Sequence, residues 1–133
     1  MYKFGTKSKQ KLMGAHDDLQ AVFNRAIQLS QYDFGISEVQ RDLETQKEYL
    51  RTGKSTTIDS RHIPDLTGKC YAGDVYAYID GKASYEERHL RAIAKAMFTA
   101  AIELGIALEW GGHWSTFVDM PHYQLSPSVY PKQ

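Results

Sequence analysis

The sequence predicts an α+β fold in which a small, mostly antiparallel sheet packs with about three helices. Two observations support this prediction. Helical and extended hydrophobic patterns alternate along the 133 residues without a repeat, and the extended segments are short. In addition, a composition that is 42% hydrophobic and 12% aromatic is typical of a globular protein. A chain of this length fits one domain, so we expect residues 1–133 to fold as a single unit.

The first half of the chain shows a helix, a strand and a second helix. Apolar residues recur at the helical period from about Asp17 to Ser30. They form one stripe, which consists of Leu19, Val22, Phe23, Ala26 and Ile27. Residues 32–39 alternate weakly, which is typical of a short strand. Asp42 is a suitable cap for a helix that extends to about Arg51. Residues 54–69 are rich in turn-forming residue types and are expected to form a loop.

The second half holds the longest predicted strand and the most regular helix. The segment Tyr71–Ile79 alternates at a period of two and ends at an Asp-Gly turn. Ser84 and Glu87 have the spacing of a capping box and begin a helix that Gly105 ends. Its predicted buried stripe consists of Leu90, Ile93, Ala94, Met97, Phe98, Ala101 and Ile102. Short strands over 106–110 and 122–125 complete the pattern.

Composition and charge argue against several classes of protein. The 16 basic and 16 acidic residues cancel, whereas nucleic-acid-binding modules normally carry a basic surplus. Cys70 is the only cysteine, which excludes an internal disulfide and a cysteine-rich zinc site. No segment approaches 18 consecutive apolar residues, so no membrane insertion is expected. The lysine-rich start lacks the apolar region of a signal peptide, which indicates a cytoplasmic protein.

Several polar side chains on the predicted strands need a chemical explanation. Asp74 shares a strand face with two tyrosines, where burial of an unpaired carboxylate would be costly. His122 lies on the last strand, and His62 lies near the end of the long loop. Two imidazoles and one carboxylate fit a zinc site that keeps its fourth position open. Asp119, three residues before His122, has the offset expected of a general base. Taken alone, such scattered residues are more often unrelated polar groups, and an aspartate near a proline is more often a turn residue, so composition and spacing give only weak support for a metal site.

The same residues resemble the motifs of a known family. Ser60-Arg61-His62 followed by Ala72-Gly73-Asp74 resembles the Ser-x-His and Ala-x-Asp signature of zinc D,D-peptidase-like enzymes. Asp119-Met-Pro-His122 resembles their second motif. The similarity is greatest to phage endolysins of the L-alanyl-D-glutamate endopeptidase type and covers almost the whole chain. Further landmarks of that group are Phe4-Gly5, Tyr32-Asp33-Phe34, Trp110-Gly-Gly and Pro121-His122-Tyr123-Gln124.

The resemblance implies a role for each matching residue. Three side chains would hold Zn²⁺, namely His62, Asp74 and His122. Asp119 would be the general base, and Arg41 matches the family arginine that stabilises charge on the substrate carbonyl. Three more residues are candidates for contacts with the substrate: Ser60, Arg61 and His113.

The chain departs from the family pattern at three places. The first histidine and the aspartate are separated by 74 − 62 = 12 positions, which is longer than usual, and the extra residues fall in the loop 64–69. His113 stands where related endolysins carry an aspartate, and the segment around Arg41 lacks the usual glycine and threonine. If the longer loop shifted the strand, Cys70 could approach the metal, although a role as a small buried apolar residue is favoured.

By resemblance, the protein is a zinc endopeptidase that cleaves the L-alanyl-D-glutamate bond of bacterial peptidoglycan and causes lysis of the host cell. We expect a monomer that has no separate cell-wall-binding domain. Without a signal peptide, it would depend on a membrane-permeabilising partner to pass from the host cytoplasm to the wall. Three alternatives remain open: a D-Ala-D-Ala carboxypeptidase on the same scaffold, a catalytically inactive, zinc-stabilised wall-binding domain, and an interaction domain without metal.

Overall fold

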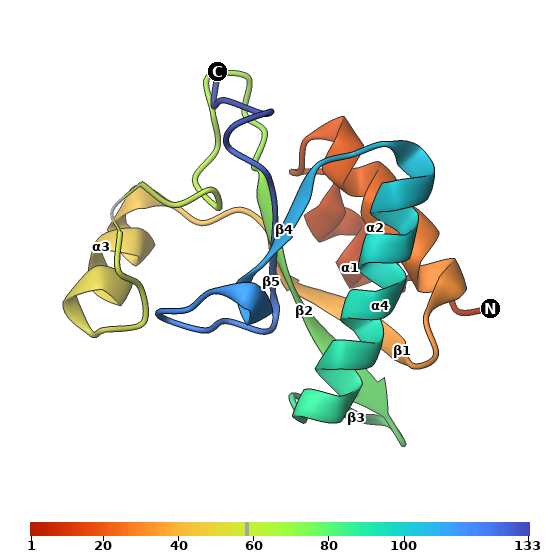
Figure 1. The fold of residues 1–133 in the computed structure, drawn as a ribbon. Coiled ribbons are helices and arrows are strands. Elements are labelled where there is room, and N and C mark those ends of the chain that lie inside the picture. The colour runs from red at the N-terminus through yellow and green to blue at the C-terminus, as the bar shows by residue number, and fades with distance from the viewer. Residues whose placement is uncertain (58) are drawn as a thin grey trace.

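One antiparallel sheet forms the centre of the structure, with α1, α2 and α4 on one side and α3 on the other (Figure 1). The computed structural model describes residues 1–57 and 59–133. Along the chain these residues form α1 (Thr6–Leu12), α2 (Asp17–Leu29), β1 (Asp33–Glu38), α3 (Leu43–Arg51), β2 (Ala72–Ile79), β3 (Lys82–Ser84), α4 (Glu87–Leu104), β4 (Leu108–Trp110), the 3-10 turn η1 (Gly111–His113) and β5 (His122–Leu125). The predicted α+β class is therefore confirmed.

The order of strands in the sheet is β1-β2-β5-β4, and β3 pairs with the outer end of β2. All of these pairings are antiparallel. The register places Asp74 on β2 opposite His122 on β5, and Gln124 on β5 opposite Glu109 on β4. Residues far apart in the sequence thus become direct neighbours at the centre of the sheet.

The hydrophobic core lies between the sheet and helices α2 and α4. Leu19 and Phe23 on α2 and Ile93 and Met97 on α4 are fully buried, as is Val75 on β2. These positions follow the helical and strand periods that the sequence shows, because one face of each element must be removed from water. Among the described residues no helix is long and apolar enough to cross a bilayer.

Several predicted element boundaries are confirmed. Helix α3 begins where Asp42 accepts a hydrogen bond from the Thr45 amide at 2.7 Å. Helix α4 ends at Gly105, whose φ of 68° is the left-handed conformation that glycine adopts readily. The expected loop over 54–69 is irregular wherever it is described, and residue 58 lies outside the described residues.

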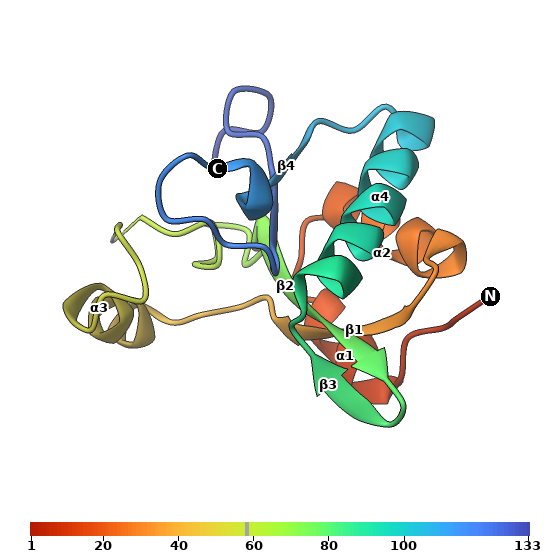
Figure 2. The same ribbon diagram turned by 60° about the horizontal axis from the view of Figure 1, so that its bottom comes forward.

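Helix α1 and strand β3 are absent from the sequence prediction. Helix α1 is rich in lysine and buries only Ser8 and Leu12, so it has no apolar stripe. It is attached to β1 through polar contacts, in which Ser8 Oγ accepts a hydrogen bond from the Ile36 amide at 3.0 Å. Strand β3 follows a turn in which Asp80 and Gly81 both have positive φ, the conformation that closes a tight hairpin. Figure 2 shows this hairpin projecting from the sheet.

The predicted start of α4 at Ser84 is wrong, because the helix begins at Glu87. Its N-cap is Glu86, without a side-chain cap, so Ser84 and Glu87 do not form a capping box. Ser84 Oγ instead lies 2.7 Å from Nδ1 of His89, which is buried and packs against the ring of Tyr32. At the other end, Ile102 is 80% exposed and does not belong to the buried stripe.

Candidate active site

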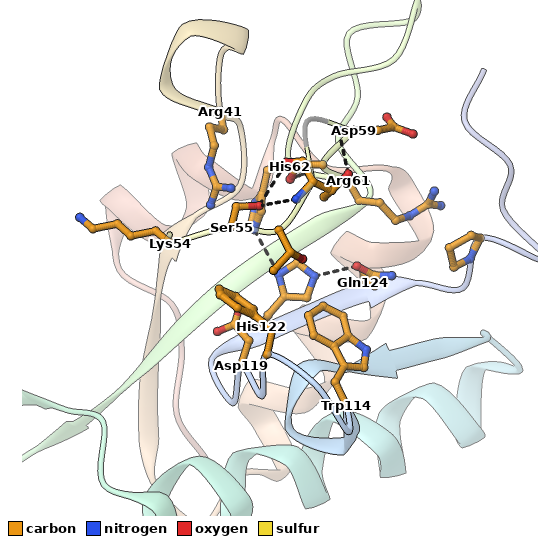
Figure 3. Close-up of a pocket in the computed structure, with 15 residues that line it drawn as sticks. Arg41, Lys54, Ser55, Asp59, Arg61, His62, Trp114, Asp119, His122 and Gln124 are labelled. Carbon is orange, nitrogen blue, oxygen red and sulfur yellow. Dashed lines mark hydrogen bonds between the residues drawn. The ribbon is translucent and has the colours of Figure 1, made fainter. Parts of the chain in front are cut away.

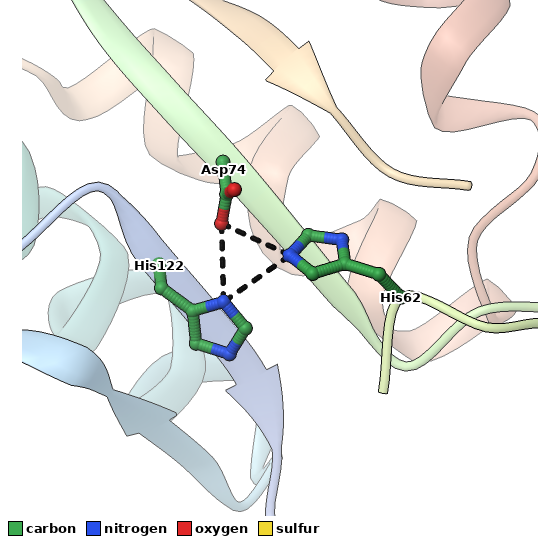
Figure 4. Close-up of side chains that lie close together, drawn as sticks. All are labelled: His62, Asp74 and His122. Carbon is green, nitrogen blue, oxygen red and sulfur yellow. Dashed lines mark hydrogen bonds and ion pairs between the residues drawn. The ribbon is translucent and has the colours of Figure 1, made fainter. Parts of the chain in front are cut away.

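Three of the predicted site residues converge on one point of the sheet (Figure 4). His62 Nε2 and His122 Nδ1 each lie 3.1 Å from Oδ1 of Asp74, and the two nitrogens are 3.3 Å apart. His62 comes from the loop before β2, Asp74 from β2 and His122 from β5. The longer loop therefore does not displace Asp74, since the strand register sets Asp74 opposite His122.

The loop that carries His62 is held by hydrogen bonds to its side chain and backbone. The Nδ1 atom lies 2.8 Å from the carbonyl oxygen of Val39, and the backbone amide donates to Ser60 Oγ at 3.1 Å. The His62 carbonyl accepts from the Arg41 amide at 2.8 Å and from the Cys70 thiol at 3.2 Å. Because a carbonyl only accepts, Val39 requires a proton on Nδ1 and leaves Nε2 with a free lone pair.

The spacing of the three donor atoms fits a tetrahedral zinc ion. Nitrogen and oxygen ligands lie about 2.0–2.1 Å from zinc, so two ligands of a tetrahedral ion are about 3.3 Å apart. The observed separations of 3.1–3.3 Å match this spacing. Two neutral imidazoles with one carboxylate are also a donor set that zinc accepts in hydrolytic enzymes.

The pKa values of the charged groups in the site depend on burial and on the neighbouring site residues. Burial would raise the pKa of Asp74, but its close contacts with the imidazoles of His122 and His62 outweigh burial and hold the pKa well below its usual range. Burial would lower the pKa of His122, yet its contact with the Asp74 carboxylate raises it. For Asp119, burial and the neighbouring Asp74 carboxylate both raise the pKa. The two carboxylates of the site therefore differ in their tendency to bind a proton.

A cavity of about 360 Å³ opens above the cluster (Figure 3). Its floor includes His62, His122 and Asp119. Its walls come from the loop that follows α3 and from the segment between η1 and β5, which contributes Trp114 and Phe117. The cavity combines polar groups at its base with the aromatic side chains of Trp114 and Phe117, a combination that is typical of ligand-binding sites.

Arg41 lies beside the cluster and is oriented by several groups. Its guanidinium donates to Glu38 and, at 2.8 Å, to Gln46 Oε1, and it lies 4.5 Å from the Tyr49 ring centre. One terminal nitrogen is 4.0 Å from Asp74 Oδ2. Arg41 also lines the cavity, so a positive charge faces both the carboxylate and the open space.

The three predicted substrate contacts lie in different environments. Ser60 is buried, and its hydroxyl accepts from the His62 amide. Arg61 borders the cavity, but its guanidinium stacks on the Tyr71 ring and donates to the Tyr130 carbonyl. His113 is exposed, stacks on Phe98 and does not line the cavity.

Cys70 is buried and does not belong to the cluster of possible metal ligands. Burial raises the pKa of its thiol to about 11, which disfavours the thiolate that zinc would bind. The sequence prediction did not identify Glu109 or the cavity walls at Lys54 and Phe117. Glu109 could have been found from the strand alternation that places it between Leu108 and Trp110, whereas the loop residues carry no such signal.

The chain is similar to enzymes of one kind. A family model described as phage L-alanyl-D-glutamate peptidase matches residues 1–124. The L-alanyl-D-glutamate peptidase of Escherichia phage T5 is 32% identical over 130 residues, which cover 97% of this chain and 93% of that protein. The crystal structure of Serratia marcescens L-Ala D-Glu endopeptidase ChiX aligns with a TM-score of 0.87 at 41% identity, covering 97% of this chain and 94% of that one.

Proposed function

The chain belongs to the phage L-alanyl-D-glutamate peptidase family and is an L-alanyl-D-glutamate endopeptidase; from that premise we propose that it is a zinc enzyme. His62, Asp74 and His122 are the proposed ligands. The observation that carries this proposal is the convergence of their three donor atoms at separations of 3.1–3.3 Å. When bound, zinc supplies a Lewis acid that polarises a carbonyl group and makes water more acidic.

Asp119 is the proposed general base. Its carboxylate lines the cavity next to His122 and is partly buried. A raised pKa suits a group that takes a proton from the attacking water and later donates it to the leaving amine. Asp74, whose pKa is held low, is poorly suited to that exchange and is better suited to remain a charged ligand. Asp119 lines the cavity but does not belong to the cluster of three donor atoms, which supports this division of roles.

Arg41 is proposed to stabilise the negative charge that develops on the carbonyl oxygen of the substrate. Its contacts with Glu38 and Gln46 fix the direction of the guanidinium before substrate binds. A donor held in this way needs no reorganisation during the reaction. Ser60 is proposed to hold the His62 loop in position through its hydrogen bond with the His62 amide. Arg61 is proposed to contact the substrate at the border of the cavity.

We propose the stem peptide of bacterial peptidoglycan as the substrate and lysis of the host cell as the outcome. Residues 1–133 would act as one catalytic domain and as a monomer, and the stem peptide would bind in the cavity above the three proposed ligands. The formal net charge of zero gives little long-range attraction to an anionic wall. The protein would remain in the host cytoplasm until a membrane-permeabilising partner gives it access to the wall.

A metal analysis combined with a digest of purified peptidoglycan tests this proposal. We expect one zinc per chain in protein purified without added metal, loss of activity with a chelator and recovery with zinc. Mass spectrometry of the products should show new amino termini on D-glutamate. Release of free D-alanine would instead identify a carboxypeptidase. Zinc without turnover would identify an inactive binding domain, and a metal-free but active protein would overturn the zinc assignment.

A further inference from the structure

We propose that Gln124 and Glu109 are positioning residues that determine which nitrogen of His122 is available to the metal. The inference rests on the proposed zinc site. It concerns two side chains that do not belong to the cluster of three ligands and that lie on the same side of the sheet as His122. Gln124 also lines the cavity, and the role proposed here for both side chains is to act through His122.

The sheet register builds a chain of hydrogen bonds behind His122. Gln124 follows His122 by two residues on β5, so both side chains emerge from the same face. Gln124 is also directly opposite Glu109 on β4. His122 Nε2 lies 2.7 Å from Gln124 Oε1, and Gln124 Nε2 donates to Glu109 Oε1 at 3.0 Å. Figure 3 shows the contact between His122 and Gln124.

Donors and acceptors can be assigned along these hydrogen bonds in only one way. A carboxylate only accepts, so Glu109 requires that the amide nitrogen of Gln124 face it. The amide oxygen of Gln124 then faces His122, where it can only accept a hydrogen bond, so Nε2 of His122 must carry the proton. A neutral imidazole with its proton on Nε2 has a free lone pair on Nδ1, the atom that lies 3.1 Å from Asp74.

In each histidine of the cluster, the nitrogen that faces away from Asp74 has an acceptor, but the two acceptors are of different kinds. Behind His62 is the backbone carbonyl of Val39, which cannot reverse its polarity. Behind His122 is a side-chain amide, which could rotate and present its nitrogen instead. Glu109 prevents that rotation, and its second oxygen accepts from Ser126 Oγ at 3.2 Å, which holds the carboxylate in place. The Gln124 amide therefore depends on Glu109 to keep its oxygen towards His122, whereas the Val39 carbonyl needs no such partner.

An exchange of the two side chains provides a sharp test. The double variant Glu109→Gln with Gln124→Glu reverses amide and carboxylate, so residue 124 still accepts from His122 and residue 109 donates to residue 124. Gln124→Leu removes the acceptor behind His122 altogether. Tyr123→Phe is the matched control, because Tyr123 lies between His122 and Gln124 on β5 and packs against Phe23 on the opposite face. Its hydroxyl has no hydrogen-bond partner in the described parts of the chain.

The first readout is zinc affinity, measured by competition with a chelator. Loss of a partner behind a ligating histidine typically weakens metal binding by about 10–100-fold, and we expect this loss for Gln124→Leu. Gln124→Glu alone, which sets two carboxylates against each other, should also weaken binding. The double variant should recover to within about threefold of wild type, and the control should match wild type. A Gln124→Leu protein with wild-type affinity, or a folded double variant no better than Gln124→Glu, would overturn the inference.

The second readout is the proton on His122 in the zinc-loaded wild-type protein, observed by ¹⁵N NMR. We expect a slowly exchanging proton on Nε2, which exchanges faster in Gln124→Leu. A proton on Nδ1 would overturn the inference even if every variant failed to fold. Failure of the zinc proposal is distinguishable, because wild-type protein would then bind no zinc at all.

Discussion

The two faces of strands β2 and β5 have different surroundings. Val75 and Tyr123 point towards the helices and are fully buried in the apolar core. Asp74 and His122, each one position away, point to the opposite side and meet His62. The same backbone hydrogen bonds therefore position both sets of side chains. Residues that stabilise the core therefore alternate along each strand with residues of the proposed metal site, so substitutions on the two faces should have different effects.

The largest effect is expected for the ligands on the polar face. His62→Ala and His122→Ala should each abolish stoichiometric zinc binding at neutral pH and reduce activity below detection, because two ligands hold zinc poorly. Elemental analysis and a peptidoglycan assay measure both quantities. Either variant with one zinc per chain and wild-type activity would show that the residue is not a ligand.

Asp119→Ala should separate chemistry from metal binding on that same face. Removal of a general base typically lowers the rate by about 10²–10⁴-fold, and we expect this loss with zinc content unchanged. The matched measurement is kcat together with zinc stoichiometry on the same sample. If zinc is lost together with activity, Asp119 is a ligand or a structural support instead.

On the helix-covered face, Leu19→Ala should lower the free energy of unfolding by about 2–5 kcal/mol, because Leu19 is fully buried on α2. Zinc content and kcat, measured well below the melting temperature, should match wild type. Denaturant unfolding gives the stability. A folded Leu19→Ala protein with reduced kcat would contradict the separation of the two faces.

The smallest effect is expected for the pH dependence of stability, through Asp65 in the loop that carries His62. Burial opposes ionisation of Asp65, but hydrogen bonds from Thr67, Tyr71 and Lys69 outweigh burial and lower its pKa. A folded pKa below the unfolded value of about 3.9 stabilises the protein above that pH and loses its effect as the pH falls further. The melting temperature of wild type should therefore exceed that of Asp65→Asn near neutral pH, and the gap should narrow by about pH 2. A gap that does not change with pH would exclude ionisation as the cause.

Much of the fold could be predicted from local patterns. The apolar stripe of α2, the Asp42 cap of α3 and the strand over 122–125 agree with the structure, because each depends on residues a few positions apart. Helix α1 could not be predicted in this way, since Ser8 and Lys11 attach it to β1 through polar contacts rather than an apolar face. Helix α4 begins after Glu86 rather than at the predicted Ser84 cap, because the Ser84 hydroxyl contacts His89 instead of capping the helix.

The candidate ligands and the family could be identified before the fold was known, since the order and residue types of the motifs around His62, Asp74 and His122 are local features. How these three side chains meet depends on the folded sheet. The pairing of Asp74 with His122 spans 48 positions, and the long-range register that creates it also brings Glu109 behind Gln124. Register arises from the packing of whole strands under α2 and α4, and no local pattern specifies which residue on a distant strand will lie opposite.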